Sequence, residues 1–102
     1  MTVLDFRINI LRFTDEQVLG LQAFLAAKLG AENIHFHGHI LYVHFTEAKA
    51  ALAIIIVGNQ KYGPRIDLLN ALDDFGNQQR QVNPDFPVRN WRLYVEPVTS
   101  DS

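Results

Sequence analysis

The chain contains no cysteine, which excludes disulfide bonds, thiolate metal ligands and a cysteine nucleophile. It has no serine before Ser100, which rules out a serine nucleophile in the body of the chain. Gly58 and Gly63 lack the lysine and hydroxyl residue that complete a phosphate-binding loop. The sequence therefore holds few of the residues on which acyl or phosphoryl transfer usually depends.

A strong charge bias and a long apolar run are absent as well. Nine basic residues oppose eleven acidic ones, and the bases are scattered along the chain. This distribution disfavours nucleic-acid binding through a basic surface. The longest apolar run, residues 50–57, is too short to cross a bilayer, and Met1 leads into a strand pattern rather than a signal peptide. We therefore expect a cytoplasmic protein without a membrane partner.

What is present suits one folded unit. Of the 102 residues, 48% are hydrophobic and 20% are charged, as in a folded protein with one modest core. We assign residues 1–98 to a single domain and expect residues 99–102 to form a frayed C-terminal tail.

The first 30 residues predict a strand followed by a helix. Apolar residues at every second position indicate a strand with one buried face; they are Leu4, Phe6, Ile8 and Ile10. Residues 14–17 read Thr-Asp-Glu-Gln, a capping box in which Thr14 caps a helix and Gln17 reaches back. Leucines at helical spacing, followed by Gly30, predict that this helix ends at residue 29.

Residues 33–45 form a branched and aromatic stretch with Gly38 in its middle. Two structures fit this pattern. One is a hairpin with strands near 33–37 and 40–46 that turns at Gly38 and His39, and the other is one long strand with a glycine bend. We favour the hairpin.

The next segment, residues 46–57, has conflicting signals. Its start resembles a capped helix, whereas its end is rich in isoleucine, which loses side-chain freedom in helices. We predict a helix that ends at Gly58 and a turn over residues 59–63. Pro64 suits the first position of a further helix, which we expect to end at Gly76, with an exposed loop over residues 77–83.

The last strand is predicted from alternation around Trp91, Leu93 and Val95, with Pro97 closing it. The predicted order is strand, helix, strand, strand, helix, helix, strand. This is an α+β fold with the ferredoxin-like β-α-β-β-α-(α)-β pattern, an antiparallel sheet with helices on one face. The other face of such a sheet is left to solvent or to a second subunit.

Histidines at alternate positions are the main candidates for ligand or metal binding; they are His35, His37 and His39, followed by His44. On one strand the first three would point to the same side and could supply the protein ligands of a zinc site. Same-face neighbours on a strand lie about 7 Å apart. Zinc-bound nitrogens lie about 2 Å from the metal, so all three converge only if the strand bends sharply. We therefore predict no cofactor, with a divalent metal as the alternative.

The triplet His35-Phe36-His37 resembles the histidine–hydrophobe–histidine motif of HUH single-strand nucleases, whose core is also ferredoxin-like. The resemblance implies a divalent ion held by the two histidines and a tyrosine that attacks phosphate. Tyr62, beside Lys61, is the tyrosine in question. Because the resemblance covers three residues and the chain shows no basic groove, nuclease activity ranks last among the alternatives.

The element order and chain length resemble the dimeric α+β barrel proteins, in which two ferredoxin-like subunits pack sheet against sheet. That superfamily includes small monooxygenases and isomerases. The resemblance implies a ligand pocket in which a histidine would carry protons at neutral pH. Tyr42, Trp91 and Tyr94 are then pocket or interface candidates, in a cleft between the sheet and the helices.

These observations lead to two hypotheses. The first is a non-catalytic binding or accessory protein that contacts a protein partner, or a second copy of itself as a homodimer, through a sheet face or a helix pair. The second is a small-ligand enzyme of the dimeric barrel type. We favour the first, because the sequence shows no convincing nucleophile or acid–base pair.

Overall fold

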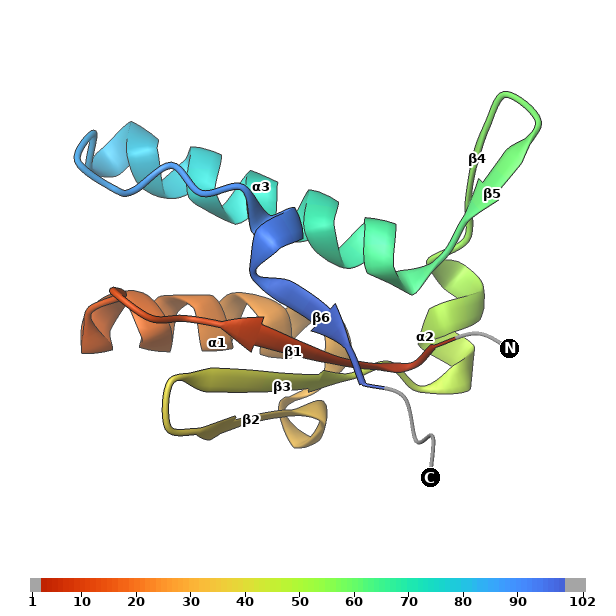
Figure 1. The fold of residues 1–102 in the computed structure, drawn as a ribbon, viewed down its shortest axis with the longest axis horizontal. Helices are drawn as coiled ribbons and strands as arrows, with labels where there is room; N and C mark the ends of the chain where they lie inside the picture. Colours follow the sequence, from red (N-terminus) through yellow and green to blue (C-terminus); the bar gives the residue numbers. More distant parts are fainter. Residues whose placement is uncertain (1–2, 99–102) are drawn as a thin grey trace.

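The computed structural model describes residues 3–98. Its main sheet has four antiparallel strands in the order β2-β3-β1-β6 (Figure 1). These strands are β1 (Asp5–Asn9), β2 (Ile34–His37), β3 (Ile40–His44) and β6 (Val95–Pro97). The helices are α1 (Asp15–Leu29), α2 (Glu47–Leu52) and α3 (Pro64–Val82), with 3-10 turns η1 (Ala31–Asn33) and η2 (Trp91–Leu93). A separate two-stranded hairpin is formed by β4 (Ile55–Val57) and β5 (Gln60–Tyr62).

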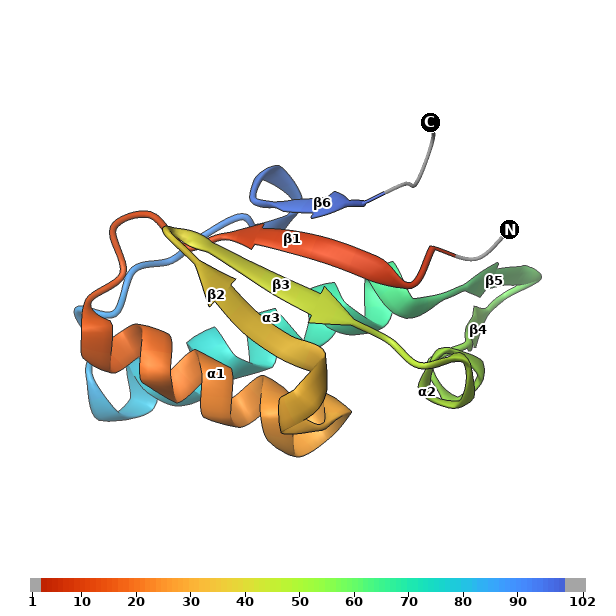
Figure 2. The same ribbon diagram turned by 90° about the horizontal axis from the view of Figure 1, so that it is seen from below.

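The core lies between the main sheet and the two long helices. Figure 2 shows α1 and α3 on the same side of the main sheet, so neither of the two long helices covers its other side. Apolar side chains of the sheet, mainly on β1 and β3, and those of the two helices meet there; they include Phe6, Ile8, Leu41, Val43, Leu21, Leu25, Leu68 and Leu72. The predicted α+β fold and the predicted one-sided burial of the first strand are confirmed, because Phe6 and Ile8 are buried whereas Asp5 and Arg7 are exposed.

The capping box at the start of α1 is confirmed. The Thr14 hydroxyl oxygen accepts from the Gln17 backbone N–H at 3.2 Å, and the Gln17 side-chain oxygen accepts from the Thr14 N–H at 3.0 Å. These two bonds satisfy amides that have no partner inside the helix. The helix runs to Leu29, as predicted, and Gly30 follows it with a positive φ of 95°.

The preferred hairpin is also confirmed. β2 and β3 pair antiparallel, with His37 opposite Ile40 and His35 opposite Tyr42. Gly38 takes φ 64° at the first turn position, where a type II′ turn favours glycine. His39 completes the turn and therefore does not lie opposite His37.

The prediction of one helix up to residue 57 is wrong. Thr46 caps a short helix, its hydroxyl oxygen accepting from the Lys49 N–H at 3.2 Å, but α2 ends at Leu52. The following segment forms β4, in line with the low helix propensity of isoleucine and valine. The predicted turn over 59–63 is likewise too long: the chain turns at Gly58, with φ 63°, and residues 60–62 are β5.

The predicted end of the second long helix at Gly76 is also wrong. α3 continues through residues 77–82, which were expected to be loop, and Asn83 caps its end. One interior glycine costs a helix only about 1 kcal/mol. The glutamine-rich residues that follow are good helix formers and outweigh this cost. Gly76 is buried, and a Cβ there would lie 3.3 Å from the Arg80 guanidinium.

The last strand begins later than predicted. Trp91–Leu93 forms η2, capped by the Asn90 side-chain oxygen, which accepts from the Arg92 N–H at 3.2 Å. A 3-10 turn has about three residues per turn, so Trp91 and Leu93 do not share a face. Trp91 is buried, whereas Leu93 is 75% exposed, so the predicted strand alternation of Trp91, Leu93 and Val95 is wrong.

Two remaining expectations concern the tail and the membrane. The predicted fraying of residues 99–102 lies outside the described residues. Among residues 3–98, no helix combines the length and the apolar character needed to cross a bilayer.

Removing the α1 cap should destabilise the fold. We expect Thr14→Ala to lower the free energy of unfolding by about 1 kcal/mol, since the Gln17 N–H loses its acceptor. For a chain of this size that corresponds to a Tm lower by about 4–8 °C, measurable by circular dichroism. Thr14→Ser keeps the hydroxyl and serves as the control. An unchanged Tm in Thr14→Ala would show that the cap does not stabilise the helix.

Candidate functional site

The candidate site is the face of the main sheet that α1 and α3 leave uncovered, hereafter the open face. Because side chains alternate along a strand, burying Phe6 and Ile8 directs their neighbours on β1 to the opposite side. The open face carries polar, aromatic and apolar residues; they are Asp5, Arg7, Asn9, His35, His37, Ile40, Tyr42, His44 and Glu96.

One row of side chains crosses all four strands. Strand pairing places His35, Tyr42, Arg7 and Glu96 side by side. The rings of His35 and Tyr42 stack with centroids 5.5 Å apart and an interplanar angle of 19°. Arg7 Nη2 lies 3.1 Å from Glu96 Oε2. The row thus joins an aromatic stack to an exposed ion pair.

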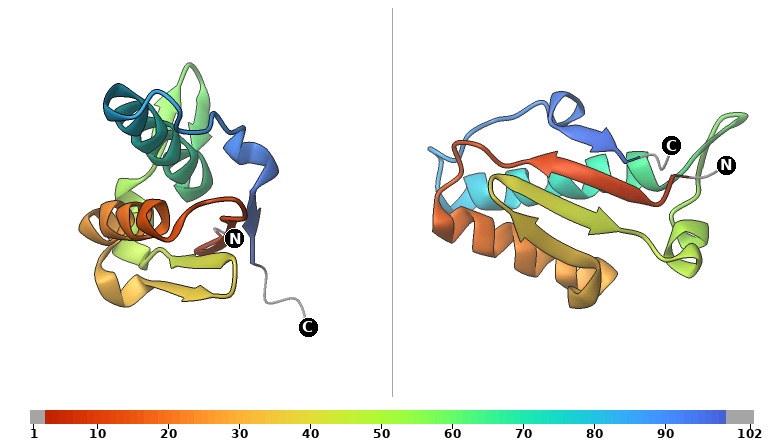
Figure 3. Two further views of the ribbon diagram at one scale, coloured as in Figure 1. Left: turned by 90° about the vertical axis from the view of Figure 1, so that its left-hand side faces the viewer. Right: turned by 60° about the horizontal axis from the view of Figure 1, so that its bottom comes forward.

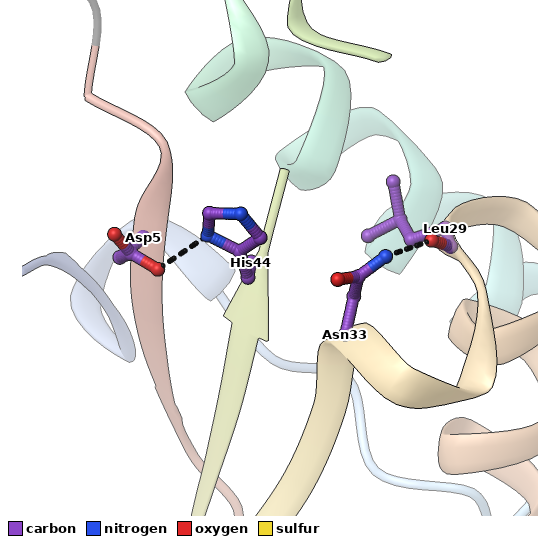
Figure 4. Close-up of polar contacts among 4 residues, drawn as sticks. All are labelled: Asp5, Leu29, Asn33 and His44. Carbon is purple, nitrogen blue, oxygen red and sulfur yellow. Dashed lines mark hydrogen bonds and ion pairs between the residues drawn. The ribbon is translucent and has the colours of Figure 1, made fainter. Parts of the chain in front are cut away.

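A second polar pair lies at the end of the same face. His44 Nδ1 lies 2.7 Å from Asp5 Oδ1, from neighbouring positions on β3 and β1 (Figure 4). The side chains are 43% and 54% exposed, so the pair contributes little to stability. The contact uses Nδ1, which leaves Nε2 as the ring nitrogen that a partner would meet. Figure 4 also shows the Asn33 amide donating to the Leu29 carbonyl at 2.7 Å, where α1 leads into β2.

A shallow hollow of about 140 Å³ lies on the open face beside β6. Its lining combines apolar, aromatic and charged side chains; they are Arg7, Asn9, Ile40, Tyr42, Leu93, Tyr94 and Glu96. A cavity of about 150 Å³ holds one benzene ring, whereas small-molecule sites usually span about 300–1,000 Å³. The hollow therefore has room for one side chain rather than for a cofactor.

The four candidate histidines do not converge. His35 and His37 are exposed on the open face, His39 is exposed in the β2–β3 turn, and His44 pairs with Asp5. Within residues 3–98, no group of three or more His, Asp or Glu is arranged to hold a metal ion. None of the four lies between the sheet and the helices, where apolar side chains fill the space.

Tyr62, the tyrosine of the nuclease-like interpretation, lies far from the histidine triplet. Its hydroxyl donates to Gln60 Oε1 at 2.7 Å within the separate hairpin. Figures 1 and 2 both show β5 at the end of the molecule away from β2. The structure therefore does not bring this tyrosine to His35 and His37.

The other two aromatic candidates contact a residue that no sequence pattern singled out. Trp91 is buried and Tyr94 is half-buried, and the Arg89 guanidinium lies over both rings, 5.4 Å and 4.2 Å from their centroids. It also lies over Phe13 and donates to the carbonyls of Asn9 and Leu11 at 2.8 Å and 2.6 Å. Arg89 thus connects the segment before β6 to the end of β1.

The electrostatics of this contact follow from its burial. Burial lowers the pKa of the Arg89 guanidinium; nearby Tyr94 raises it, and Arg12 lowers it further. Arginine keeps its charge at neutral pH despite such shifts. In the sequence, only the nearby Trp91 and Tyr94 could have indicated that Arg89 packs on aromatic rings. Phe13, the third ring that it contacts, is distant along the chain.

A larger hollow lies away from the open face, beside α2. Its volume is about 570 Å³, and apolar side chains and one carboxylate line it; the residues are Leu4, Glu47, Ala50, Ala51, Ile54, Gly63 and Pro64. The sequence did not indicate this hollow, because it is bounded by segments from three parts of the chain. Ile54 connects it to the start of β4.

Comparison with known proteins adds no assignment. The chain matches no protein-family model, no curated protein and no solved structure. The candidate site therefore depends on the geometry of its own side chains.

Because the histidine side chains lie apart in the structure, we expect no specific zinc site. We expect wild type and His37→Ala to take up the same small amount of zinc in a calorimetric titration, because His37 lies opposite Ile40 rather than beside a second ligand. His44→Ala serves as a second comparison. Stoichiometric binding in the wild type that is lost in His37→Ala would contradict this expectation.

The Arg89 contact should contribute measurably to stability. We expect Arg89→Gln to lower the free energy of unfolding by about 2 kcal/mol, because it removes charged hydrogen bonds to two carbonyls and the aromatic contacts. Arg92→Gln, at an exposed position nearby, should change it by less than about 0.5 kcal/mol. Urea denaturation measures the free energy of unfolding of both variants. Equal decreases in the two would show that the Arg89 contacts do not stabilise the fold.

Proposed function

We propose that this chain is a non-catalytic binding or accessory protein whose open face contacts another protein. The observation that carries the proposal is the hollow of about 140 Å³ on that face, lined by Tyr42, Tyr94 and Leu93. Protein interfaces commonly have a few central anchor side chains in small pockets, surrounded by a polar rim. Arg7 and Glu96 supply such a rim at the edge of this hollow.

The proposal includes a fold of ferredoxin-like type. The sheet order β2-β3-β1-β6 is compatible with it: β3 lies between β1 and β2, which α1 connects, and β6 pairs with the other side of β1. In this interpretation, α2 and the β4–β5 hairpin are an insertion before α3. The hairpin lies outside the main sheet and so leaves that order unaffected.

The partner should present one apolar or aromatic side chain surrounded by polar groups. The hollow accepts a single ring, and the exposed ion pair beside it can form hydrogen bonds to the partner's rim. The stacked His35 and Tyr42 rings extend the contact toward β2. Tyrosine offers a rigid apolar area with a polar tip, which makes it common among the residues that dominate binding.

A dimeric barrel enzyme is supported less well. Packing a second sheet on the open face would bury the Arg7–Glu96 and Asp5–His44 pairs, and each buried ion costs several kcal/mol unless it is well compensated. The hollow is also smaller than a usual substrate pocket. The nuclease alternative has no support from the placement of Tyr62. A cytoplasmic location stays a prediction from the sequence.

Site-specific photo-crosslinking tests the proposal. A photoreactive phenylalanine analogue at Tyr94 should capture a protein that the same analogue at Gln78, exposed on α3, does not. Tyr42→Ala should then weaken binding of the purified partner by roughly 30-fold, as expected for an anchor residue worth about 2 kcal/mol. Gln78→Ala is the matched control. Equal capture at both positions, or unchanged affinity in a folded Tyr42→Ala, would contradict the proposal.

A further inference from the structure

The β4–β5 hairpin stands apart from the main sheet. Figures 1 and 3 show it projecting from the end of the molecule near α2, beyond the main sheet. Within residues 3–98, β4 and β5 pair only with each other, so each strand keeps one unpaired edge. An isolated two-stranded hairpin is marginally stable in water, and further strands stabilise it.

The two edges differ in charge. Lys61 lies at the centre of β5 and is exposed. Residues 53–57 carry no charge and no proline, and Ile54 and Ile56 are 51% and 65% exposed. Proteins usually protect an edge strand with a charge, a proline or a bulge, because an unprotected edge pairs with other chains. The β4 edge lacks the charged residue and the proline that would protect it.

The turn geometry places the backbone of Ile56 on that edge. Residues that flank a two-residue hairpin turn exchange hydrogen bonds, and bonded and non-bonded pairs then alternate. Val57 pairs with Gln60 next to the turn, and Ile56 pairs with Lys61 one step further away. The N–H and C=O of Ile56 therefore point away from β5, toward the free edge.

Repulsion between lysines and the need for a closed assembly together select which strands pair. If two β5 strands paired symmetrically, Lys61 would lie opposite its own copy, and like charges directly opposite are destabilising. If β4 paired with β5 of a second copy, free edges would remain at both ends and the assembly would grow without closing. Pairing β4 with a second β4 brings no charges together and leaves only the edges that carry Lys61.

We propose that two copies of this chain pair antiparallel through β4, with Ile56 on the two-fold axis. Each Ile56 donates its N–H to the other's carbonyl, and the hairpins join into one sheet in the order β5-β4-β4′-β5′. The dimer leaves the open face of the main sheet free. The proposed dimer does not depend on the proposed function, so finding or not finding the dimer leaves the proposed function unchanged.

Apolar surface beside the edge adds to the contact. A pair of three-residue strands buries less than the roughly 1,200–2,000 Å² of a standard interface. Leu52 is 81% exposed just before β4, and Ile54 lines the hollow of about 570 Å³ beside α2. We expect these exposed groups to enlarge the apolar contact next to the strands. We expect a reversible dimer with a dissociation constant in the micromolar range.

Disulfide trapping tests the pairing, since the chain has no cysteine of its own. Directly opposed residues in a hydrogen-bonded antiparallel pair have Cα atoms about 5.5 Å apart, within the range of disulfides. Under mild oxidation, Ile56→Cys should form a covalent dimer at least about tenfold faster than Leu19→Cys, a matched control on the exposed surface of α1 that is 64% exposed. Equal rates would overturn the proposal.

Charge substitution provides a second test on the full chain. Sedimentation velocity should show that Ile56→Glu and Ile56→Lys each weaken dimerisation by roughly tenfold or more, whereas a mixture of the two restores it. Leu19→Glu should leave the dimer intact, and circular dichroism confirms that each variant is folded. A wild-type chain that stays monomeric up to submillimolar concentration, a dimer that survives both Ile56 variants, or larger assemblies would overturn the proposal.

Discussion

One-sided burial of the central strands is the constraint on which the rest of the structure depends. Phe6 and Ile8 on β1, with Leu41 and Val43 on β3, lose almost all contact with water against α1 and α3. Burying each such side chain contributes about 1.5–3 kcal/mol, so a one-residue slip of a strand would expose its entire apolar set. The same alternation fixes the outward direction of Tyr42 and the other side chains of the open face.

The open face is completed by a segment that is not part of the regular sheet. Arg89 holds the residues before β6 against the end of β1 by donating to the carbonyls of Asn9 and Leu11 and packing over aromatic rings. The 3-10 turn that follows places Leu93 outward, where it lines the hollow with Tyr94. The candidate binding surface therefore depends on hydrogen bonds between residues 80 and 78 positions apart in the sequence.

The sequence predicted those elements in which local signals agree. The capping box, the alternation of β1 and the glycine turn of the β2–β3 hairpin each have a single physical interpretation. Residues 46–57 combine a helix start with β-branched residues, and the chain follows each signal in turn as α2 and β4. Residue spacing predicted the start of the last strand wrongly. Trp91 and Val95 are buried, and this pattern fits both a strand and a 3-10 turn over the residues between them. The dimeric-barrel resemblance named Tyr42 and Tyr94 as pocket candidates but placed them between the sheet and the helices, and for Tyr42 that placement is wrong. The hollow that both residues line is on the opposite face and needs η2 and Arg89, for which the sequence has no period or motif.

Hydroxyl-radical footprinting of the dilute monomer tests the one-sided sheet most directly. We predict rapid modification of Tyr42, Tyr94 and Leu93, which line the open face, and strong protection of Phe6 and Phe45, which are 1% exposed beneath it. Protection of Tyr42 as strong as that of Phe6 in the monomer would mean that the chain covers both faces of its sheet. That result would contradict one-sided burial and the binding surface derived from it.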